Sequence, residues 1–171
     1  MTECPCPNSV GAVIQAYGPV ITSGAILISA FVAICAIVYN ARLVRRRATI
    51  DLMMHHKSDG ELVAAKKKIL ALLDDGVQLA KYALRENASS QENDCILLVL
   101  NSREFIAGGI REGAFDEKTY KRLQCQVFLR DWRAMEGYVS EFRRTRDRPT
   151  LFQEFEWLAK RWQADPQTLD P

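Results

Sequence analysis

A long stretch without charged residues constrains this chain more than any other feature. Between Glu3 and Arg42 the 171-residue sequence contains no Asp, Glu, Lys, Arg or His, and its most apolar part runs from Val20 to Tyr39. About 20 apolar residues in a helix cross a hydrocarbon layer of roughly 30 Å, and the backbone groups of a helix satisfy one another there. The sequence therefore predicts a single transmembrane helix over residues 19–41.

Two other interpretations of this stretch are weaker. The core helix of a soluble protein rarely stays uncharged over such a length, and this segment has no polar stripe. A signal peptide places Lys or Arg before a shorter apolar core. Here every Lys and Arg lies at or beyond Arg42, and no obvious small-residue cleavage site precedes it.

Arginines cluster directly after the apolar stretch. Residues 42–68 hold eight bases against three acids, whereas residues 69–171 hold 15 against 17. Lys and Arg favour the cytoplasmic side of a membrane, so we expect the N-terminus outside the inner membrane and the C-terminal part in the cytoplasm. Each base near an anionic leaflet contributes about 1 kcal/mol. The predicted contacts with anionic lipid are Arg42, Arg45, Arg46 and Arg47.

One face of the predicted membrane helix carries small side chains at every fourth position. Ala25, Ser29 and Ala33 form this row. Small residues at that spacing let helix backbones approach closely in lipid. The row predicts a homo-oligomer, although Ala and Ser are also simply common in membrane helices.

The rest of the chain predicts an all-α fold, in which the membrane helix continues into a cytoplasmic helical bundle. We divide the chain into a short external segment (1–18), the transmembrane helix (19–41), a helical domain (42–163) and a flexible tail (164–171). Apolar periodicity and helix-breaking residues predict helices over 19–57, 59–74, 77–86, 91–111, 116–146 and 151–163. Ser58 and Glu61 have the spacing of a capping box.

Two of these helices carry clear apolar faces. For 91–111 the expected inward face is Cys95, Leu98, Val99, Ser102, Phe105, Ile106 and Gly109. For 116–146 it is Phe128, Trp132, Met135, Val139 and Phe142.

Polar residues in the middle of these helices predict a structural clamp. Asn101 and Glu104 lie one turn apart, and Arg130 and Asp131 lie in the middle of the next long helix. A carboxylate inside a bundle needs an Arg or a helix-end amide close by. A catalytic acid is the alternative, but no second carboxylate pair or nucleophile accompanies these residues.

No catalytic residue, metal site or cofactor is predicted. The only histidines, His55 and His56, have no further ligands at the spacing of a metal site. The five cysteines form no metal or disulfide framework, and Cys4 and Cys6 are better placed for an intermolecular disulfide than for bridging each other. The short Arg-to-His spacing of helical ribonucleases of the HEPN type is absent.

Several segments resemble a known family. LNSREFIAGGIREGAFDEKTYKR (100–122), RDW (130–132), FEWLAKRW (155–162) and the RATIDL that begins at Arg47 resemble the bacterial family catalogued as domain of unknown function 4760. The resemblance covers roughly residues 38–163. It implies an N-terminal membrane helix followed by a small all-helical cytoplasmic part, and it implies no activity, cofactor or catalytic residue.

The expected function is that of a non-enzymatic, membrane-anchored interaction and oligomerisation module, with bacterial stress or phage defence suggested by analogy alone. Its expected partners are the lipid bilayer, further copies of the chain and an unidentified protein, with no nucleic acid. One alternative is an oligomeric pore or membrane-perturbing effector, although the membrane helix has no charge for a selectivity ring. A membrane-associated nuclease is the less favoured alternative.

Overall fold

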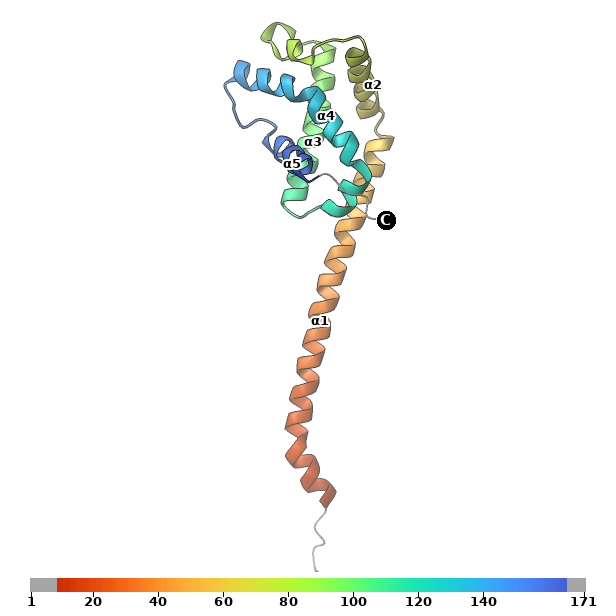
Figure 1. Ribbon diagram of the computed structural model, residues 1–171. Coiled ribbons are helices and arrows are strands. Elements are labelled where there is room, and N and C mark those ends of the chain that lie inside the picture. The colour runs from red at the N-terminus through yellow and green to blue at the C-terminus, as the bar shows by residue number, and fades with distance from the viewer. Residues whose placement is uncertain (1–8, 166–171) are drawn as a thin grey trace, which may run out of the picture. The chain divides into compact units, whose positions relative to one another are not determined.

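The structure is a computed structural model that describes residues 9–165 of the chain. The predicted external segment 1–18, with Cys4 and Cys6, and the predicted tail 164–171 therefore lie wholly or partly outside the described residues. Over residues 9–165 the chain is helical without strands, which confirms the all-α prediction. The elements are α1 (Ser9–Ser58), α2 (Gly60–Asp74), η1 (Leu79–Ala83), η2 (Arg85–Asn87), α3 (Gln91–Arg111), α4 (Glu117–Arg146) and α5 (Gln153–Ala164), where η denotes a 3₁₀ helix (Figure 1).

The chain divides into two compact units, Met1–Leu43 and Val44–Pro171. In the first unit, α1 begins at Ser9 and runs through Gly18 and Pro19, so it starts ten residues before the predicted helix. No proline interrupts Ser9–Tyr17, which explains the earlier start. The apolar side chains from Ile26 onward, Phe31 among them, are exposed to the surroundings of the helix.

Side-chain caps define where three helices of the second unit begin. Asp59 accepts a hydrogen bond from the amide of Leu62 at 3.0 Å, and Asp116 accepts one from Thr119 at 2.9 Å. Ser90 does the same at the start of α3. The predicted capping box at Ser58 is wrong, because the Ser58 hydroxyl donates to the carbonyl of His55 and Asp59 takes the cap position one residue later.

The predicted α-helix over 77–86 is instead two short 3₁₀ helices. Gly76 precedes them with φ +71° and Leu84 separates them in an extended conformation. So short a segment between two breaks gains too few hydrogen bonds to nucleate an α-helix. Leu79 and Ala83 are buried and hold the segment to the domain.

An aromatic cluster forms the centre of the second unit, where α5 lies against α3 and α4 (Figure 1). The Phe128 ring meets Phe155 with ring centroids 4.7 Å apart and Trp162 at 4.9 Å, and Trp132 meets Phe155 at 5.1 Å. The predicted α4 face is confirmed for Phe128, Trp132, Met135 and Val139, which are buried. Large rings of this kind supply much of the apolar burial of a small domain.

The predicted inward face of α3 is confirmed at Val99 and Ile106, which are buried, and is wrong at Phe105. Phe105 is 63% exposed, and the buried positions include Asn93, Leu100 and Arg103. The apolar periodicity predicted that Phe105 faces the interior, because a charged residue such as Arg103 is normally assigned to the solvent side. Hydrogen bonds to Asp131 and to Tyr138 reverse that preference for Arg103 and Asn93.

Candidate functional site

The buried guanidinium of Arg103 joins α3 to α4. Its Nε and Nη2 atoms donate to Oδ2 of Asp131 at 3.1 and 2.5 Å, and Nη1 donates to the Tyr120 hydroxyl at 2.9 Å. Arg103 is only 2% exposed, and its guanidinium lies 5.6 Å from the centre of the Phe128 ring. A two-point contact to one carboxylate and a contact to a phenol fix the guanidinium in both position and orientation.

A small cavity opens beside this guanidinium, and we call it the Arg103 pocket. It has a volume of about 90 Å³ and draws its lining from α1, α2, α3 and α4. The residues that line it are Met53, His56, Lys57, Lys66, Arg103, Tyr120 and Gln124. Most of these side chains carry hydrogen-bond donors, and three of them carry a fixed positive charge.

The electrostatics of the Arg103 pocket disfavour further positive charge. Burial lowers the pKa of His56, and the neighbouring cations Lys66 and Arg103 lower it further, against a smaller opposing effect of Asp59. Burial also lowers the pKa of Lys66, with Arg103 acting in the same direction. Burial raises the pKa of the Tyr120 phenol, so its hydroxyl stays protonated at neutral pH.

Glu104 serves a different purpose, because it caps α5 from another helix. Its two carboxylate oxygens accept the backbone amides of Glu154 at 3.2 Å and Phe155 at 2.7 Å. The residue before α5, Phe152, has φ +57° and offers no side-chain cap. Burial raises the pKa of Glu104, and the two amide hydrogen bonds oppose this shift.

The members of the predicted clamp separate in the structure. Asn101 is exposed, and the side chain of Arg130 is 58% exposed with only a 3.3 Å contact to Asp131. Asp131 instead pairs with Arg103, and Glu104 is held by helix-end amides. The correction follows from the phase of α3, which turns Arg103 inward and Asn101 outward.

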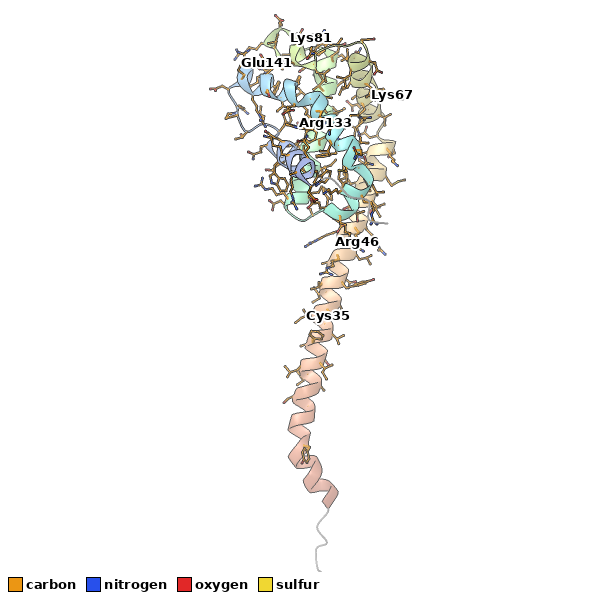
Figure 2. The ribbon with its side chains drawn as sticks, in the orientation of Figure 1. Cys35, Arg46, Lys67, Lys81, Arg133 and Glu141 are labelled. Carbon is orange, nitrogen blue, oxygen red and sulfur yellow. The ribbon has the colours of Figure 1, made fainter. Side chains whose placement is uncertain are left out.

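The predicted basic and small-residue positions of α1 are exposed. Arg42, Arg45, Arg46 and Arg47 are all exposed, as are Ala25, Ser29 and Ala33. The Ser29 hydroxyl donates to the carbonyl of Ala25 at 2.8 Å, a common way for serine to satisfy itself in an apolar helix. Arg46, labelled in Figure 2, also lines a groove of about 340 Å³ with Lys118, Arg122 and Leu123.

Sequence reasoning missed four residues of this region: Thr49, Lys66, Arg103 and Tyr120. The Thr49 hydroxyl, fully buried, donates to the carbonyl of Arg45 and accepts the amide of Asp116, both at 2.8 Å. The usable signal for Arg103 was its place one turn from Leu100 and Ala107 on a helix with few other charges. Nothing in the sequence signalled that Lys66 differs from Lys67 and Lys68.

The arrangement of side chains around the Arg103 pocket suits the binding of an anion. Within the described part of the chain, no three His, Cys, Asp or Glu residues are grouped so that they could hold a metal ion. The pocket offers donors around a positive centre, a pattern that recognises anions.

Fold and site together define the class: an all-α domain preceded by an apolar helix long enough to cross a membrane. None of the most apolar window of that helix is buried within the chain, although a signal sequence would share its length and composition. A family model described as Domain of unknown function (DUF4760) matches residues 23–162. The protein therefore belongs to this family, as its sequence motifs predict. No curated protein and no solved structure matches the chain.

We predict that Arg103→Met lowers the free energy of unfolding by about 3–5 kcal/mol, because Asp131 is left buried without its partner. Urea unfolding of the full chain in mild detergent, followed by tryptophan fluorescence, measures the change. Arg130→Met is the matched control and should cost less than about 1 kcal/mol. Adding Asp131→Leu to Arg103→Met should recover part of the loss. Equal effects of the two arginine substitutions would contradict this account.

Glu104→Gln should change the free energy of unfolding by less than about 1 kcal/mol at neutral pH, because one amide oxygen still accepts from α5. Glu104→Leu leaves two backbone amides without acceptors and should cost about 1–3 kcal/mol. Since the folded-state pKa of Glu104 is raised, the parent should lose stability relative to Glu104→Gln as the pH rises above the ordinary glutamate pKa. Unfolding curves over a pH series test both points, and a Gln variant as unstable as the Leu variant would refute them.

Proposed function

We propose that the chain is a single-pass membrane protein whose helical domain acts in the cytoplasm as a non-enzymatic interaction module. The observation that carries this proposal is the uncharged α1 segment, which buries none of its apolar window within the chain and is followed at once by arginines. Apolar side chains such as Phe31 at 68% exposure need lipid or another protein around them.

The arginines after the apolar segment support an orientation with the domain in the cytoplasm. Lys and Arg close to the end of a membrane helix are retained on that side. The groove is lined by Arg46, Asp116, Lys118, Thr119, Arg122 and Leu123. It adds two cations of α4, Lys118 and Arg122, to the sequence cluster, against the single carboxylate of Asp116, and Leu123 beside them is exposed. Such a combination of bases and an apolar residue suits an anionic bilayer surface. In a bacterium this places the protein in the inner membrane.

Self-association is the second part of the proposal. The row of Ala25, Ser29 and Ala33 is free of bulky side chains, and the Ser29 hydroxyl folds back onto its own helix. A partner helix of the same kind can therefore approach this row closely. An oligomer would present several copies of the cytoplasmic domain to one partner and raise its avidity.

The topology predicts the behaviour of reporter fusions at the C-terminus. Alkaline phosphatase, which is active only outside the cytoplasm, should be inactive there, and green fluorescent protein should fluoresce, because the arginines hold their end inside. Labelling of Cys4 and Cys6 in intact cells with a thiol reagent that does not cross the membrane serves as the reciprocal control, because these residues are expected outside. High phosphatase activity with a dark fluorescent fusion at the C-terminus would reverse the proposed orientation.

The oligomer should depend on the small-residue row. Ser29→Leu with Ala33→Leu is expected to lower the mass of the complex measured by light scattering in mild detergent, because bulky side chains separate the backbones. Cys35→Leu is the matched control, since Cys35 lies about 120° around the helix from Ser29 and is exposed (Figure 2). An unchanged mass in the double variant would move the contact away from this face.

A further inference from the structure

Lys66 lacks the partner that a half-buried ammonium normally has. It lines the Arg103 pocket, yet no hydrogen bond or ion pair joins it to any residue from 9 to 165. Two other partly buried lysines of the domain are paired: Lys68 contacts Glu92 at 3.2 Å and Lys121 contacts Asp165 at 3.0 Å. The lysines Lys57, Lys67 and Lys118 have no ion pair among the described residues either, but they are exposed to solvent. Removing a cation from water without a partner costs free energy. An anion bound in the pocket would supply the partner that Lys66 lacks.

The nearby carboxylates are already engaged. Asp131 accepts two of the three hydrogen bonds that the Arg103 guanidinium donates. Asp59 accepts the backbone amide of Leu62 at the start of α2. Three cations, Lys57, Lys66 and Arg103, outnumber these two carboxylates. The surroundings of the pocket therefore keep a net positive charge even with His56 neutral.

Unused hydrogen-bond donors surround the same small volume. Of the five N–H groups of Arg103, three donate to Asp131 and Tyr120, which leaves two. The Tyr120 hydroxyl accepts from Arg103, and its own proton has no acceptor among the described residues. His56 makes no hydrogen bond within the same part of the chain, and its only ring contact is with His55.

We propose that the Arg103 pocket binds a phosphoryl group. Its donors come from four helices and surround the volume, which suits an anion with several outward oxygens better than a planar carboxylate. A phosphate monoester carries a charge of about −1.5 to −2 at neutral pH, enough to neutralise the excess cations. A volume of about 90 Å³ is several times the space that one water molecule needs, so the pocket has room for one such group and leaves the rest of the ligand outside. The phosphoryl group comes either from a soluble phosphate ester or from a lipid headgroup.

Lys66 and His56 have defined roles in this site. Lys66 supplies a charge-assisted hydrogen bond that no protein group competes for, and Arg103 supplies a guanidinium already oriented by Asp131. The charged and titratable groups around His56 are His55 and Lys57 of α1, Asp59 at the start of α2, Lys66 of α2, Arg103 of α3 and Tyr120 of α4. Its pKa is lowered in the free protein, and a bound anion favours the charged imidazole. Binding should therefore raise the pKa of His56.

The test uses the full chain in phosphatidylcholine nanodiscs, titrated with inorganic phosphate and with glycerol 3-phosphate by calorimetry, while histidine NMR follows His56. Saturable binding and a higher His56 pKa are expected. Lys66→Met should weaken binding about tenfold or more, the loss of one charge-assisted hydrogen bond. Lys67→Met, on the exposed side of α2 (Figure 2), is the matched control and should bind like the parent. His56→Gln provides a second variant should Lys66→Met fail to fold.

A second arm separates the two sources of the phosphoryl group. Nanodiscs that also contain phosphatidic acid expose a phosphate monoester at the bilayer surface. If a headgroup is the ligand, the His56 shift appears without added phosphate and soluble phosphate no longer binds. If a soluble ester is the ligand, phosphatidic acid leaves the titration unchanged. Absence of binding in both arms, or equal binding by Lys66→Met, Lys67→Met and the parent, would overturn the proposal.

Discussion

The helical domain that follows the apolar segment depends on one buried charge. The Arg103 guanidinium bonds Asp131 and Tyr120 and lies over Phe128, so it touches both the polar and the aromatic part of the interior. An ion pair of this kind adds little net stability compared with a well-packed apolar pair, but it allows only one rotation of α3 against α4. The same rotation brings Glu104 to the start of α5 and leaves Phe105 at the surface. Specificity of packing, more than stability, is what this residue provides.

The sequence was sufficient for the α-helices that the structure describes and for the aromatic face of α4, because both follow from periodicity, but it predicted an α-helix over 77–86 where the structure has two 3₁₀ helices. It failed at α3, where the buried face contains Arg103 and Asn93. Asn93 donates to the carbonyl of Ala88 and accepts the hydroxyl of Tyr138 at 2.6 Å, so its burial depends on a residue 45 positions away. Rules that assign polar residues to solvent cannot anticipate such partners. The Arg103 pocket was missed for the same reason, since its lining comes from four helices.

Helix ends show a similar division between local and distant causes. Asp59, Ser90 and Asp116 cap their own helices within three residues, and such caps can be found by inspection. The start of α5 has no local cap, and its amides bond a carboxylate some fifty residues earlier in the chain. The single clue was that Glu104 is an acid in an apolar context, which predicted a partner but left open whether that partner was an arginine or a backbone amide.

The order of α4 and α5 along the chain has a consequence during synthesis. Phe155 and Trp162 cover Phe128 and Trp132, so the aromatic surface of α4 stays uncovered until the ribosome has also made α5. If α1 enters the bilayer first, the incomplete domain lies close to lipid while its aromatic surface is still exposed. In that case the charged residues of the domain, including the arginines of α4, would keep the nascent chain out of the hydrocarbon layer until α5 packs onto Phe128 and Trp132. Truncation before Phe155 would leave Phe128 and Trp132 of α4 permanently uncovered.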